Sequence, residues 1–131
     1  SGYGAGYGYG YGSGYGDGYW KQFLAAGAGL AESGRRRIAE LSAAGSTIAF
    51  WRSGPDGAPA NGGAGGPVRA GALQEVAGPL RLCSCHALHA TLDPCAWGGA
   101  RLWVVALLGE VRAEGNKIGA LRREIIGEVT Q

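Results

Sequence analysis

Every cysteine and every histidine of this chain lies in one stretch that runs from residue 83 to residue 95 and reads CSCHALHATLDPC. Thiols and imidazoles are side chains that bind zinc, form disulfides, or act as nucleophile and base. The stretch is therefore the first place to look for chemistry. Its candidate residues are Cys83, Cys85, His86, His89 and Cys95.

The spacing of these side chains makes them weak candidates for a metal site. Structural zinc usually takes its ligands from C-x(2–4)-C and H-x(3–5)-H pairs on two segments. Here the pairs are C-x-C and H-x-x-H, and both belong to one segment. A disulfide from Cys95 to Cys83 or Cys85 stays open for an oxidising exterior, and a Cys–His nucleophile lacks an identifiable third group to orient it. We expect mainly small buried thiols and one structural histidine.

The rest of the chain adds no catalytic signature. It contains no GxxxxGK[ST] phosphate loop, no HExxH and no GxSxG. Its later carboxylates, such as Glu110 and Glu124, are spread through the expected strands and turns, so no pair of them can be assigned to a common pocket. The sequence predicts a protein that is not an enzyme, with no catalytic residues and no cofactor.

The charge pattern argues against nucleic acid and membrane as partners. The formal net charge is +2, which is too weak for the basic footprint of a nucleic-acid binder. The only basic run, Arg35-Arg36-Arg37, is interpreted as the solvated face of a helix. No apolar stretch approaches the roughly 20 residues of a membrane span. The first residues also lack the basic and apolar regions of a secretory signal.

The first 19 residues repeat glycine and tyrosine. Glycine occupies every even position from Gly2 to Gly18, and all six tyrosines of the chain stand at odd positions. Because side chains alternate between the faces of an extended strand, one face would be bare and the other an aromatic ladder. A disordered low-complexity tail is the alternative; we favour an extended arm that makes contacts. The expected contact residues are Tyr3, Tyr7, Tyr9, Tyr11, Tyr15, Tyr19 and Trp20.

Helical patterns follow the arm. Apolar residues at positions 20, 23, 24 and 30 can share one helix face. Ser33 is the expected N-cap of a second helix over residues 34–44, and Gly45 is its expected stop. The glycines between positions 27 and 34 predict a break between the two helices.

Strand patterns make up most of the remainder. We expect strands at residues 46–52, 73–76 and 80–83, with a long Gly/Pro-rich loop over residues 54–67. The apolar run from 102 to 108 predicts a central strand buried on both faces. Residues 118–129 are expected to form one final strand after a turn at 114–117.

The predicted organisation has two parts. An extended Gly/Tyr-rich arm covers residues 1–19, and a single small domain covers residues 20–131. The predicted fold class of that domain is α+β, with N-terminal helices followed by a small, mostly antiparallel sheet.

Several segments together resemble a domain family of bacterial and phage genomes. They are IAFWRSGPDGAPANGG at 48–63, the run from Leu73 to Cys83, ALHATLDP at 87–94, RLWVVALLGEV at 101–111 and KIGALRREII at 117–126. That family carries no assigned activity and often follows Gly/Tyr-rich (GYGYG) N-termini like this one. Its C…G-h-H-A…P core corresponds here to Cys83, Leu88, His89, Ala90 and Pro94.

The resemblance also bears on the metal candidates. Where the family usually has a basic residue and glycine, this chain has Cys85 and His86, which counts against these two as part of an inherited metal site. Some such domains look distantly like ADP-ribosyltransferase folds. This chain lacks an evident NAD-clamping arginine and catalytic glutamate motif, so that likeness is an analogy of fold.

The expected function is structural self-assembly. The arm would make contacts between subunits, either by adding a strand to a partner's sheet edge or by packing tyrosines into its grooves. The settings compatible with this are a phage virion component or a homopolymeric filament, with copies of this chain or virion proteins as partners. The expected location is a virion or an extracellular assembly of a protein made in the cytoplasm without a signal peptide. Two alternatives stay open: an ADP-ribosyltransferase-like enzyme with His89 lining a pocket, and a small zinc-binding interaction module.

Overall fold

The structure is a computed structural model that describes residues 21–24, 27, 29–56, 68–96, 98–115 and 117–129. The predicted arm of residues 1–19, with all its tyrosines, lies outside the described residues. The same holds for Trp20 and for most of the predicted loop 54–67.

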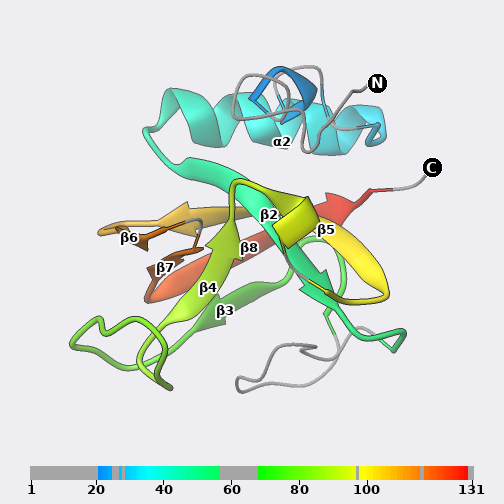
Figure 1. Cartoon of the computed structure of the whole chain (residues 1–131). Coiled ribbons are helices and arrows are strands. Elements are labelled where there is room, and N and C mark those ends of the chain that lie inside the picture. The colour runs from blue at the N-terminus through cyan, green and yellow to red at the C-terminus, as the bar shows by residue number, and fades with distance from the viewer. Residues whose placement is uncertain are drawn as a thin grey trace.

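The described residues fold mainly into one sheet of seven strands, in which every neighbouring pair is antiparallel (Figure 1). The strands are β2 (Thr47–Ser53), β3 (Leu73–Glu75), β4 (Leu88–Thr91), β5 (Arg101–Leu108), β6 (Arg112–Glu114), β7 (Lys117–Ala120) and β8 (Arg122–Glu128). Their order across the sheet is β3-β8-β5-β2-β4-β7-β6. The antiparallel sheet is as expected, but the protein is mostly sheet rather than an α+β fold led by N-terminal helices.

Helical structure in the described residues comprises residues 21–24, the helix α2 (Glu32–Ala43) and the short 3₁₀ turn η1 (Pro94–Ala96). The start of α2 differs from the prediction, because the N-cap is Ala31 and Ser33 lies inside the first turn. Alanine has no side-chain oxygen to bond the free N–H groups there. The predicted stop is confirmed: Gly45 has a φ of 89°, which glycine adopts without strain.

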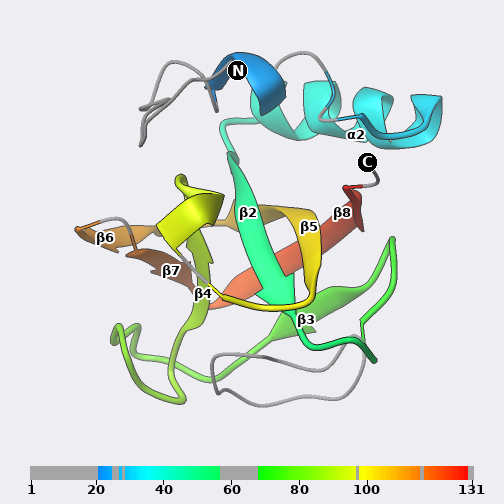
Figure 2. The ribbon, with the colours of Figure 1, turned by 45° about the vertical axis from the view of Figure 1, so that its right-hand side comes forward.

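The neighbouring strands β2 and β5 lie between two hydrophobic cores, because successive side chains of a strand point to opposite faces of the sheet. On one face, Phe50 and Val104 pack with the inward side chains of α2, Ile38 and Leu41. Figure 2 shows α2 lying along this side of the sheet. The opposite face packs Trp51, Trp103 and their apolar neighbours. The predicted strand at 102–108 is confirmed, since its central residues are buried on both faces.

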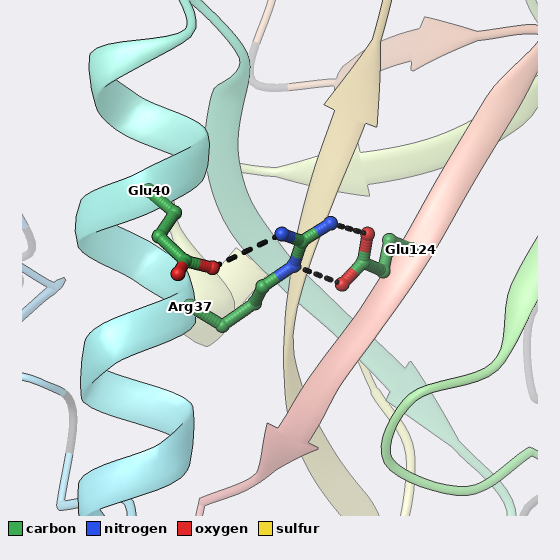
Figure 3. A network of polar contacts seen from close by, with 3 residues as sticks. All are labelled: Arg37, Glu40 and Glu124. Carbon is green, nitrogen blue, oxygen red and sulfur yellow. Dashed lines mark hydrogen bonds and ion pairs between the residues drawn. The ribbon is translucent and has the colours of Figure 1, made fainter.

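A charged pair fastens α2 to the sheet. The Arg37 guanidinium donates from Nε and Nη2 to the two carboxylate oxygens of Glu124 in β8, at 2.7 and 2.8 Å, and from Nη1 to Glu40 at 3.1 Å (Figure 3). Such two-point contacts fix orientation as well as distance. They also hold the pKa of Arg37 above its ordinary value.

The other two arginines of the basic run are also engaged within the chain. Arg35 donates to the carbonyl of Leu30 at 2.6 Å, and Arg36 pairs with Glu32 at 2.9 Å. All three arginines are exposed on α2, which agrees with their interpretation as the solvated face of a helix. Their hydrogen-bonding groups are directed at neighbouring residues of the same chain.

Two predicted strands were wrong in detail. Residues 80–83 form no strand; they lead into a turn before β4. Residues 118–129 form two strands, β7 and β8, which part at Leu121. The reason is topological, because β7 pairs with β4 and β6 whereas β8 pairs with β5 and β3. The chain must turn a corner at Leu121 to move from one side of the sheet to the other.

A buried arginine shows that the sheet is strongly curled. Arg123 of β8 donates from Nη1 to the carbonyl of His89 in β4 at 2.6 Å. Two strands, β5 and β2, stand between β8 and β4, which in a flat sheet would separate them by about 14 Å. Such a contact requires the face opposite α2 to be concave.

The same guanidinium has two further partners, neither of which is a carboxylate. It donates from Nε to Gln74 of β3 at 2.7 Å, and it lies over the ring of Trp51 in β2 at 4.4 Å. No ion pair involves Arg123 among the residues that the structure describes. With only 3% of its surface exposed, it has a pKa lowered by burial. It thus joins four strands of the sheet at the expense of desolvating a charge.

We expect Arg123→Ala to lower the free energy of unfolding by about 2–4 kcal/mol, because it leaves a cavity and removes the donor from two partly buried acceptors. Urea denaturation measures this. The matched control is Arg122→Ala, since Arg122 is the exposed neighbour on the same strand, and we expect it to change stability by less than about 0.5 kcal/mol. Equal losses in the two variants would contradict a bridging role for Arg123.

Candidate functional site

The structure does not gather the five Cys and His candidates into one site. All three cysteines are free and exposed, so the expected buried thiols are wrong. Among the described residues, no group of three or more His, Cys, Asp or Glu side chains is placed to hold a metal ion. Only Cys83 and His89 are joined by a hydrogen bond.

The turn before β4 holds itself together through its own polar groups. The Ser84 hydroxyl donates to the Arg81 carbonyl at 2.6 Å and accepts the N–H of His86 at 3.0 Å. The His86 ring bonds the carbonyl of Ala77 through Nδ1 at 2.7 Å. His86 therefore has a structural role, because its ring bonds the backbone of the preceding segment.

This turn packs against β7 at a residue that has no side chain. A Cβ added at Gly119 would lie 2.6 Å from a methyl carbon of Leu82 and 3.5 Å from the His89 ring. Glycine at this position lets the turn approach the strand closely. The approach brings Cys83 to the start of β7, where Lys117 lies.

Cys83, His89 and Lys117 form a hydrogen-bonded cluster, which we call the Cys83 cluster. The Lys117 ammonium donates to the Cys83 sulfur at 3.3 Å, and the Cys83 main-chain N–H donates to His89 Nε2 at 2.9 Å. Cys83 has a φ of 59°, which is uncommon for a residue other than glycine. The cluster combines an exposed thiol, an adjacent positive charge and a constrained backbone.

His89 is held as a neutral acceptor in this cluster. Burial lowers its pKa, and the nearby positive charges of Lys117 and Arg123 lower it further. A neutral ring that accepts at Nε2 carries its proton on Nδ1. Because the Cys83 N–H already uses the Nε2 lone pair, that nitrogen is not free to take the thiol proton. The arrangement provides a cation beside the sulfur and gives no support to a Cys–His nucleophile of the usual type.

Cys95 lies apart from the Cys83 cluster, in the turn η1. The Asp93 carboxylate accepts the N–H of Cys95 at 3.1 Å, and the Thr91 hydroxyl accepts the N–H of Asp93 at 3.0 Å. These contacts cap the turn after β4. Burial and the charge of Asp93 raise the pKa of the Cys95 thiol above its ordinary value, which lowers its thiolate fraction at neutral pH.

The sequence reasoning found two of the three cluster residues and missed Lys117. The Cys/His stretch drew attention to Cys83 and His89, whereas Lys117 opens a strand 34 residues after Cys83. No spacing rule links them, because the contact depends on how β7 pairs with β4. The predicted contact residues of the arm, Tyr3 to Trp20, lie outside the described part of the chain.

No protein-family model, curated protein or solved structure matches this chain. The likeness to a bacterial and phage domain family, and the ADP-ribosyltransferase analogy with it, accordingly stay hypotheses. In the described part of the chain, no helix has the length and apolar character that crossing a membrane requires.

The state of His89 makes the stability of the fold depend on pH. Its pKa in the folded state lies below the ordinary value of 6.5, so the unfolded chain binds a proton more readily than the folded one. His89 therefore contributes stability that is fully present above pH 6.5 and declines as the pH falls. We expect the urea concentration at the unfolding midpoint to decrease when the pH is lowered from about 7 to about 5.

The matched variant is His89→Gln, which places an amide oxygen near the position of Nε2 and cannot titrate. We expect it to keep the bond from the Cys83 N–H and to lose a measurable part of the pH dependence. An unchanged pH dependence in His89→Gln would show that carboxylates alone cause it.

Proposed function

We propose that this protein is a structural, self-assembling subunit, in which the Gly/Tyr segment of one chain adds a strand to the β3 edge of another. The observation that carries the proposal is the combination of an alternating Gly/Tyr segment with a partly apolar sheet edge, β3, which pairs with no second strand among the described residues. A virion component and a filament subunit are both compatible with such an arrangement.

The β3 edge has main-chain groups directed away from the sheet. The Ile125 N–H donates to the carbonyl of Ala72 at 2.8 Å, and the Val76 N–H donates to the carbonyl of Leu121 at 2.9 Å. In an antiparallel pair, alternate residues bond to the same neighbour. The main-chain groups of Leu73 and Glu75 therefore point away from β8. Among the described residues, no main-chain hydrogen bond engages them on that side.

The opposite edge of the sheet is a poorer acceptor. Strand β6 consists of Arg112, Ala113 and Glu114, so two of its three exposed side chains are charged. Charges on an edge strand discourage further pairing. Strand β3 has a single charged residue, Glu75, and also presents Leu73, whose surface is 59% exposed. A partner strand at β3 gains apolar contact in addition to backbone hydrogen bonds.

The Gly/Tyr segment has the side-chain pattern that this edge requires. Leu73 pairs with Glu124, which faces α2, so the exposed leucine lies on that face of the sheet. An added strand can direct its tyrosines to the same face and cover Leu73 as a cross-strand neighbour. Its other face carries only glycine, which leaves the opposite side of the edge free of new side chains.

Removal of residues 1–19 is expected to give a monomer, whereas the full chain assembles, because the proposed donor strand is lost. Sedimentation velocity over a range of concentrations measures the species present. Circular dichroism and the urea midpoint serve as controls for folding. Assembly of the shortened chain to the same extent as the full chain would refute the role of this segment.

The acceptor edge is tested separately with proline, which lacks an N–H donor. We expect Glu75→Pro to weaken assembly strongly while sparing the ladder to β8, because the Glu75 N–H points outward. The matched control is Ala113→Pro on β6, where the pairing Glu114↔Lys117 directs the Ala113 groups outward as well. If both variants assemble alike, β3 is not the acceptor, even where the deletion shows that the Gly/Tyr segment is needed.

A further inference from the structure

A hydrogen bond in the Cys83 cluster brings a nucleophile and an oxidisable sulfur together. Lys117 Nζ lies 3.3 Å from Cys83 Sγ, although the two residues are 34 positions apart in the chain. The thiol is exposed and therefore accessible to small solutes. The amine and the sulfur are close enough that a covalent bond between them needs only a small shift of two side chains.

The fold fixes the positions of both residues. Cys83 is held at a φ of 59° by the bond from its N–H to His89 Nε2, and the Ser84 hydroxyl closes the turn next to it. Lys117 begins β7 and pairs with Thr91 of β4 on one side and Glu114 of β6 on the other. The sulfur and the amine are thus presented to each other by two rigid elements.

We infer that Cys83 and Lys117 form a redox-dependent covalent crosslink, a sulfenamide, when the protein meets hydrogen peroxide. This modification site is independent of the assembly proposed above. Hydrogen peroxide supplies the oxidising equivalents, and no metal or further cofactor takes part.

The chemistry balances in two steps. In the first, the Cys83 sulfur attacks peroxide: an S–O bond forms, the O–O bond breaks and one water leaves, which gives a sulfenic acid. In the second, the Lys117 amine, after loss of its extra proton to water, attacks that sulfur. An S–N bond forms, the S–O bond breaks and a second water leaves. The sulfur is oxidised by two electrons, peroxide is reduced to two waters, and the chain loses two hydrogens.

Only Cys83 among the three exposed cysteines has this arrangement. No hydrogen bond joins a lysine to Cys85 or Cys95 in the residues that the structure describes. Both are exposed and serve as internal controls. Condensation of a sulfenic acid with a nearby nitrogen protects sulfur from further, irreversible oxidation. The crosslink would give Cys83 this protection and leave the other two thiols without it.

The test uses the full chain, oxidised with hydrogen peroxide at neutral pH, digested without reductant and analysed by mass spectrometry. We expect a linked pair of peptides, one containing Cys83 and the other Lys117, with the mass of their sum less two hydrogens. Dithiothreitol is expected to separate them. The Cys85→Ser/Cys95→Ser double variant is expected to give the same linked pair.

The decisive variant is Lys117→Arg, which keeps a positive donor beside the sulfur but removes the amine. We expect it to abolish the linked pair and to increase labelling of Cys83 by dimedone, a trap for sulfenic acid, several-fold over wild type. The proposal is overturned if dimedone labels Cys83 equally in wild type and Lys117→Arg. It is likewise overturned if peroxide joins Cys83 to Cys85 as a disulfide in place of the lysine link.

Discussion

The buried guanidinium of Arg123 is the contact on which the shape of this sheet depends. β2 and β4 are neighbours in the sheet, yet their pairing register comprises the single pair Phe50↔Thr91. Beyond that pair the two strands diverge, and the carbonyl of His89 in β4 needs another donor. Arg123 supplies it from β8, across the concave face. A shorter side chain could not span that gap. Lysine lacks the planar guanidinium, whose separate N–H groups let Arg123 bond Gln74 as well.

The same contact connects the core to the exposed thiol. Arg123 binds the His89 carbonyl, the His89 ring accepts the Cys83 N–H, and Cys83 in turn receives Lys117. Two of these residues are positive charges, and together with burial they lower the pKa of His89 and keep its ring an acceptor. The position of the sulfur therefore rests on a histidine that is neutral because of its surroundings. The same series of contacts, from Arg123 through His89 to Cys83, therefore supports the fold and also positions the thiol.

Much of the sheet could be predicted from the sequence, because its central strands carry their signal locally. Seven apolar residues in succession at 102–108 indicate burial on both faces whatever lies beside them. The division of 118–129 into two strands could not be predicted, since it depends on where the partner strands lie. The same limit explains Lys117, whose role arises from the pairing of β7 with β4. Ser33 was wrongly predicted as the N-cap, because its capping preference is a local signal. The helix starts earlier, at Glu32, and is stabilised by the packing of Ile38 and Leu41.

The shortness of the β3 edge accounts for the composition of the proposed donor strand. Only Leu73 and Glu75 direct main-chain groups outward, and each hydrogen bond adds about 1 kcal/mol net. Backbone pairing at such an edge is too weak by itself to hold two chains, so side chains must supply most of the binding. Tyrosine gives a large contact area for few rotatable bonds. Because glycine recurs at every second position, a slip by two residues keeps the tyrosine face on the same side. In the proposed assembly the repeat can then dock in several registers, which multiplies the bound states that a short edge can support.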